Sequence, residues 1–120
     1  MPHILVIEDD DEVRSLITEF LVKEGHDVSE ATNGLEGASA YVDGTFDIVI
    51  TDIMMPSQDG VETIRSLKEH DASVRVIAIT GYRGSFNRLP AAEFVGAKKT
   101  LVKPFTKEEL LEAVDDVLAA

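Results

Sequence analysis

The sequence contains no cysteine, so the fold has no disulfide bonds, which fits a reducing compartment. It also lacks long apolar runs: each is a few residues long, whereas a membrane-spanning helix needs roughly 20 residues. The first residues, Met1-Pro2-His3-Ile4, do not form the basic and apolar segments of a signal peptide. These absences favour a cytoplasmic protein that does not associate with membranes.

Basic residues are scarce as well. The chain has 11 Lys and Arg against 23 Asp and Glu, which gives a net charge of -12 at pH 7. Nucleic acids and anionic membranes bind positive surfaces, so the composition argues against direct contact with either. An acidic surface suits a divalent cation or a basic partner.

Short apolar segments alternate with segments of helical periodicity over the whole chain, without repeats or a low-complexity linker. The expected strands cover residues 4–7, 28–31, 48–50, 76–79 and 101–102. Most are rich in Val and Ile, as in parallel sheets that are buried on both faces. The sequence therefore predicts one domain, residues 1–120, of the α/β class: an open five-stranded parallel sheet with helices on both faces.

Helical spacing is clearest near the two ends of the chain. An apolar stripe runs through residues 13–21, with Asp10 or Asp11 as the N-cap and Gly25 as the stop. Thr106 and Glu109 form a capping box ahead of a second stripe over residues 110–118. Weaker patterns predict helices over residues 35–42 and 61–67. The segment after residue 80 has the weakest helical pattern, because two glycines and a proline interrupt it.

Polar residues follow four of the five expected strands. Glu8 and Asp9 follow the first strand, Asp52 the third, Thr80 the fourth and Lys103 the fifth. Ligands of open parallel sheets bind beyond the carboxyl ends of the strands, so these groups are expected at one edge. Individually, each has an ordinary explanation: an acidic helix cap, a turn residue, a strand end or a surface lysine. Their coincidence at four strand ends favours a site.

The chemistry of such a site follows from its groups. Carboxylates held close together repel unless a cation is present, and hard oxygen ligands favour Mg²⁺. A lysine and a hydroxyl beside the metal can hold the oxygens of a phosphoryl group. One carboxylate can act as the nucleophile and form an acyl phosphate.

Several segments together resemble a response-regulator receiver domain, and the resemblance covers essentially the whole chain. They are the run from Ile4 to Asp10 (ILVIEDD), the run from Asp47 to Pro56 (DIVITDIMMP), Asp59-Gly60, the strand ending at Thr80, Gly96-Ala97, and the run from Leu101 to Phe105 (LVKPF). The resemblance implies a flavodoxin-like sheet with strand order 2-1-3-4-5. It also implies a phosphorylation-dependent switch in a two-component system.

The resemblance assigns a role to each site residue. Asp52 would accept a phosphoryl group from a histidine kinase or phosphotransfer protein, and Thr80 and Lys103 would contact that group. Signalling to a downstream protein would follow by conformational change. The domain would not be an enzyme, beyond assisting its own phosphorylation and dephosphorylation.

The resemblance also implies a Mg²⁺ site. Asp9 and Asp52 would bind the metal directly and Glu8 through water, and the backbone carbonyl of Met54 would complete the protein ligands. The peptide bond before Pro104 would be cis.

The sequence departs from the family pattern at two places. Thr100 stands where the family usually has Tyr or Phe, and the segment 81–87, with Tyr82 and Phe86, is unusual. The interpretation is that this segment, rather than residue 100, reports phosphorylation.

A phosphohydrolase of the haloacid-dehalogenase type is the alternative from another functional class. Residues 9–13 (DDDEV) fit the D-x-D-x-[TV] motif of that family, with Asp9 as the nucleophile. The late acidic pair of that family is not evident after Lys103, and the chain is short for that fold. The two hypotheses differ in which aspartate is phosphorylated.

Overall fold

The computed structural model describes residues 2–53, 60–81 and 96–119. Five strands form one parallel sheet in the order β2-β1-β3-β4-β5, which confirms the expected fold class and strand order. The strands are β1 (His3–Ile7), β2 (Asp27–Ala31), β3 (Ile48–Asp52), β4 (Val76–Gly81) and β5 (Lys99–Lys103).

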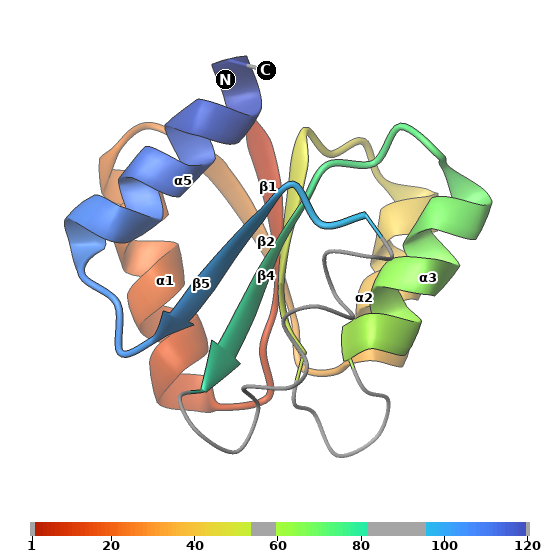
Figure 1. Ribbon diagram of the computed structural model, residues 1–120, viewed down its shortest axis with the longest axis horizontal. Helices are drawn as coiled ribbons and strands as arrows, with labels where there is room; N and C mark the ends of the chain where they lie inside the picture. Colours follow the sequence, from red (N-terminus) through yellow and green to blue (C-terminus); the bar gives the residue numbers. More distant parts are fainter. Residues whose placement is uncertain (1, 54–59, 82–95, 120) are drawn as a thin grey trace.

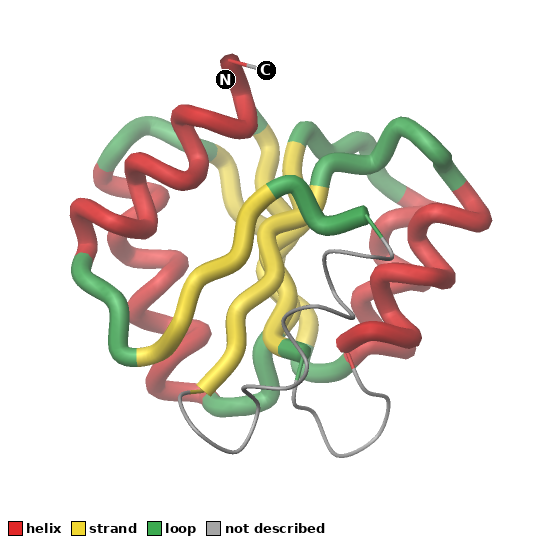
Figure 2. Tube along the Cα trace, in the orientation of Figure 1, coloured by secondary structure: helices red, strands yellow, loops and turns green. Residues whose placement is uncertain are grey.

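Helices cover both faces of the sheet. They are α1 (Asp11–Lys23), α2 (Gly34–Asp43), α3 (Gly60–His70) and α5 (Lys107–Ala119). Helices α1 and α5 lie on one side of the sheet, and α2 and α3 lie on the other (Figure 1). The tube in Figure 2 shows the same three layers, with the strands between the two pairs of helices. The segment with the weak helical pattern and the expected readout segment both fall mostly in residues 82–95, outside the described residues.

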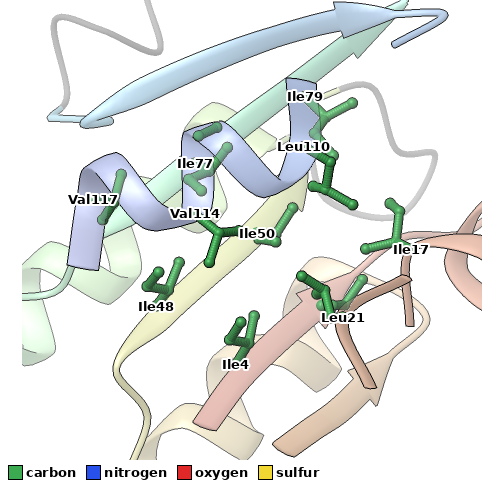
Figure 3. Close-up of a cluster of buried hydrophobic side chains, with 12 residues drawn as sticks. Ile4, Ile17, Leu21, Ile48, Ile50, Ile77, Ile79, Leu110, Val114 and Val117 are labelled. Atoms are coloured by element: carbon green, nitrogen blue, oxygen red, sulfur yellow. The ribbon is translucent and has the colours of Figure 1, made fainter. Parts of the chain in front are cut away.

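The core consists of two layers because alternate strand residues point to opposite faces of the sheet. In β1, Ile4 and Val6 pack with α1 and α5, whereas Leu5 and Ile7 pack on the side of α2 and α3. Figure 3 shows the first of these layers, in which side chains of the strands meet those of α1 and α5. All four of these β1 side chains are fully buried, which explains why the strands read as continuous apolar runs.

The predicted caps form. Asp10 Oδ1 accepts hydrogen bonds from the backbone N–H groups of Glu12 and Val13, at 3.0 and 3.2 Å. In the capping box before α5, Glu109 N donates to Thr106 Oγ1 at 3.0 Å and Thr106 N donates to Glu109 Oε1 at 2.9 Å. The backbone that leaves α1 turns at Gly25, where φ is 90°, a conformation that glycine adopts without steric cost.

The apolar stripe expected in α1 is too wide, and α2 packs differently from a helix with an apolar face. Leu16 in α1 is 49% exposed, because Ile17 and Leu21 occupy the face that packs on the sheet. In α2, Leu35 and Val42 are also exposed, and the buried positions include two glycines. One of these, Gly37, lies so close to β1 that a Cβ there would be 2.3 Å from Cδ1 of Ile7. At this position the backbone of α2 packs directly against Ile7, while Tyr41 of the same helix is buried in the core layer on this side.

Candidate functional site

The register of the sheet brings the polar strand ends to one edge. Ile7 pairs with Thr51, so Glu8 and Asp52 directly follow a matched pair on neighbouring strands. On the other side of β3, Asp52 pairs with Ile79, and Gly81 at the end of β4 pairs with Lys103 at the end of β5. Thr80 lies in β4 directly after Ile79, and its side chain is outside the described part of the structure.

Lys103 joins two buried carboxylates. Its Nζ lies 2.8 Å from Oδ2 of Asp52 and 2.9 Å from Oε1 of Glu8. Glu8 is 1% exposed and Asp52 is 4% exposed. Charged groups in such surroundings need charged partners, because burial removes the water that would otherwise solvate them. The ammonium group supplies a partner to both.

The electrostatic balance at Glu8 favours its neutral form. Burial raises the pKa of Glu8 from 4.5 to about 7; the hydrogen bond from Lys103 opposes this shift, and the negative charge of Asp52 adds to it. At Lys103, burial alone would lower the pKa, but the bonds to Asp52 and Glu8 outweigh it and the pKa is raised. The lysine therefore stays charged at neutral pH, while the Glu8 carboxyl keeps its proton to a higher pH than an ordinary glutamate does.

Asp9 completes a group of three carboxylates. One oxygen each from Glu8, Asp9 and Asp52 lie within 4.8 Å of one another, and Asp9 is exposed to solvent. The chain turns sharply after β1, where Asp10 N donates to Oε2 of Glu8 at 3.2 Å. Three clustered carboxylates, all oxygen donors, are a group that can bind a hard divalent cation.

The structure brings four of the six sequence-predicted site residues together: Glu8, Asp9, Asp52 and Lys103. Met54 lies outside the described residues. The peptide bond between Lys103 and Pro104 is cis, as the resemblance implied. Thr100 is half-buried in β5 and pairs with Ala78 of β4.

One residue at the site was missed from the sequence. The Nη1 of Arg14 donates a hydrogen bond to the backbone carbonyl of Glu8 at 2.9 Å. The spacing of Arg14 from Asp11, three residues earlier on the same helix, predicts that these two side chains lie side by side, but it does not predict the contact with the Glu8 carbonyl.

Comparisons with known proteins identify the family. The family model of the response regulator receiver domain matches residues 4–115. The chain belongs to this family. Receiver domains of response regulators are phosphorylation-dependent signalling switches of two-component systems, and this chain has that role.

Known relatives and a solved structure are similar to this chain over nearly its full length. The chemotaxis protein CheY of Halobacterium salinarum is 35% identical over 118 residues, 98% of each chain. The chemotaxis protein CheY of Bacillus subtilis is 36% identical over 120 residues, covering 98% of this chain and 99% of the relative. The response regulator TrrA of Thermotoga maritima, in complex with Mg²⁺-BeF, superposes with a TM-score of 0.88 at 32% identity, over 98% of this chain and 100% of that one.

The described residues contain no helix that is long and apolar enough to cross a membrane. The expected cytoplasmic location stays a prediction.

Proposed function

We propose that Asp52 is the phosphoryl acceptor of this receiver domain. A carboxylate oxygen of Asp52 forms a bond to phosphorus as the phosphorus–nitrogen bond of a phosphohistidine breaks, and the imidazole leaves. The observation that carries this proposal is the contact of Lys103 Nζ with Oδ2 of Asp52 at 2.8 Å, next to the Glu8 and Asp9 carboxylates. A nucleophilic carboxylate needs a nearby positive charge to receive an anionic phosphoryl group, and Lys103 supplies one.

Lys103 and Thr80 serve as the contacts of the transferred group. Lys103 holds a phosphoryl oxygen with its ammonium, since the charge remains at neutral pH. Thr80, at the end of β4, supplies the hydroxyl of the switch. The charge that Lys103 now shares between Asp52 and Glu8 becomes available to the phosphoryl oxygens.

Mg²⁺ fits the donor set. Glu8, Asp9 and Asp52 provide hard oxygen donors, and the backbone carbonyl of Met54 is proposed as a further one. The carboxylate oxygens of these three residues lie within 4.8 Å of one another, close enough for all three residues to take part in holding one ion, with Asp9 and Asp52 proposed as direct ligands and Glu8 as a ligand through water. When bound, the ion neutralises charge on the phosphoryl oxygens and the carboxylates.

The wider role follows from the family. The phosphoryl donor is a histidine kinase or a phosphotransfer protein, and the output is a contact with a downstream protein. Direct nucleic-acid binding by this domain is not part of the proposal, because the net charge is -12. The whole of residues 1–120 forms one receiver domain. Its own chemistry is limited to gaining and losing the phosphoryl group on Asp52.

The haloacid-dehalogenase alternative receives no support. The family match covers residues 4–115, and the relatives named above are chemotaxis and response-regulator proteins. Asp9, the nucleophile of that hypothesis, is exposed, whereas Asp52 is buried and lies against Lys103.

Fluorine NMR with Mg²⁺ and beryllofluoride, a phosphoryl mimic, tests the assignment. The wild type is expected to give resonances of bound fluoride that require Mg²⁺. Asp52→Asn is expected to give none, while Asp47→Asn, which changes an exposed aspartate one residue before β3, keeps them. Bound resonances in Asp52→Asn would overturn the assignment.

A further inference from the structure

Arg14 connects three elements around the end of β1. Its Nη1 donates to the backbone carbonyl of Glu8 at 2.9 Å, and its Nε donates to Oε1 of Glu30 in β2 at 2.9 Å. Its Nη2 donates to Oδ1 of Asp11 in the first turn of α1 at 2.6 Å. All three guanidinium nitrogens are therefore engaged, each with a partner from a different place in the chain.

The geometry points to a positioning role for Arg14. We propose that its guanidinium fixes the peptide between Glu8 and Asp9, and thereby holds the two acidic side chains in the arrangement that binds Mg²⁺. The proposal rests on the proposed metal site. The carbonyl that Arg14 contacts belongs to this peptide, so Arg14 acts on the metal ligands through the backbone.

Burial separates Arg14 from an ordinary surface ion pair. Its side chain is 14% exposed, whereas its partner Asp11 is 85% exposed. Exposed pairs contribute little to stability because water screens them. Arg14 instead has a mostly covered side chain whose guanidinium bonds a backbone carbonyl, and such a contact constrains the path of the chain.

The shape of the guanidinium matters as much as its charge. Its donors lie in one plane and point in fixed directions, so one group can serve a carbonyl and two carboxylates at the same time. Lysine carries the same charge on a single nitrogen and cannot reproduce this arrangement. Arg14→Lys therefore separates geometry from charge.

The sign of the effect distinguishes positioning from simple electrostatics. If Arg14 acted only through its charge, removing that charge would make the acidic site more negative and strengthen Mg²⁺ binding. If it positions the ligands, Arg14→Lys and Arg14→Gln both weaken Mg²⁺ binding. Loss of a group that orients metal ligands typically costs roughly tenfold or more in affinity.

Titration calorimetry of the full chain with MgCl₂ measures the dissociation constant, and thermal unfolding without Mg²⁺ reports folding separately. We expect about a tenfold weaker constant for Arg14→Lys and Arg14→Gln, measured well below their unfolding midpoints. The matched control is Arg65→Gln, which removes the arginine of the exposed Arg65–Glu62 pair, also with three-residue spacing, in α3. The control is expected to keep the wild-type constant.

Two outcomes would overturn the proposal. An unchanged constant in Arg14→Lys would show that geometry is not needed, even if the metal-free midpoint fell. Tighter binding in Arg14→Gln would assign the role to charge. If the proposed metal site itself is wrong, the result differs from both of these outcomes. The wild type would then show no Mg²⁺ binding that depends on Asp9.

Discussion

Lys103 Nζ lies 2.9 Å from Oε1 of Glu8, although 95 positions separate the two residues in the chain. The same nitrogen contacts Asp52, so one cation bridges two buried carboxyl groups, one directly after β1 and one at the end of β3. The charges at the ends of β1, β3 and β5 are therefore coupled. A change in the charge of Glu8, Asp52 or Lys103 alters the electrostatic energy of the other two.

Removal of Lys103 is expected to destabilise the metal-free protein. Lys103→Ala leaves Glu8 and Asp52 without this counter-charge, at a cost of about 2 kcal/mol in the free energy of unfolding. Denaturant unfolding with and without Mg²⁺ measures the effect, which should shrink with Mg²⁺ because the ion replaces the missing charge. The control is Lys99→Ala, at the other end of β5, which removes an exposed ion pair with Asp116 of α5. It should change stability by less than about 0.5 kcal/mol. Equal losses in both variants would contradict the buried pairing.

The raised pKa of Glu8 gives stability a pH dependence of known sign. The folded protein holds this proton up to about pH 7, whereas an ordinary glutamate releases it near 4.5. The folded state therefore binds more protons between these values, and the contribution of Glu8 to stability falls as the pH rises from about 4.5 through about 7.

Glu8→Gln tests this contribution because glutamine resembles the neutral acid. In metal-free protein, the variant is expected to gain stability relative to the wild type as the pH rises through this window, by up to about 3 kcal/mol. Other ionisable groups contribute to both proteins and largely cancel in the difference. Parallel stability curves for the two proteins across the window would show that the pKa of Glu8 is not raised.

Mg²⁺ is expected to raise the thermal midpoint of the wild type at neutral pH, because a ligand that binds only the folded state stabilises it. Asp9→Ala should lose most of this response, and its metal-free midpoint is not expected to fall, since one repelling charge is gone. Differential scanning calorimetry compares it with Asp43→Ala, which removes an exposed aspartate at the end of α2. An undiminished Mg²⁺ response in Asp9→Ala would exclude Asp9 as a ligand.

Gly37→Ala tests the close packing of α2 against the strand that leads into Glu8. The added Cβ would lie 2.3 Å from Cδ1 and 2.6 Å from Cγ1 of Ile7, a fully buried side chain. Overpacking of this kind costs about 1 to 3 kcal/mol, more than the gain in helix propensity of up to about 1 kcal/mol. Urea unfolding measures it, with Ser39→Ala on the exposed side of α2 as the control. A stabilised Gly37→Ala would mean that α2 can shift outward freely.

Much of the fold could be predicted because the sheet is buried on both faces. Each central strand therefore appears in the sequence as an apolar run, and the polar residue that follows it marks the edge where ligands bind. That rule alone groups Glu8, Asp52 and Lys103 from the sequence.

Features that depend on how elements pack could not be predicted in the same way. The exposure of Leu16 depends on which side of α1 meets the sheet, and periodicity gave a stripe that was too wide. The burial of Gly37 depends on the distance between α2 and β1. The contact of Arg14 with the Glu8 carbonyl depends on the turn after β1, which leaves no trace in the order of residues.

The most direct test of the account is the site of phosphorylation. The wild type is incubated with acetyl phosphate, with and without Mg²⁺, and the phosphorylated residue is mapped by mass spectrometry after the acyl phosphate has been reduced to a stable product. The expected result is a single Mg²⁺-dependent modification at Asp52, absent from Asp52→Asn. A modification at Asp9 that persists in Asp52→Asn would contradict the account and favour the hydrolase chemistry.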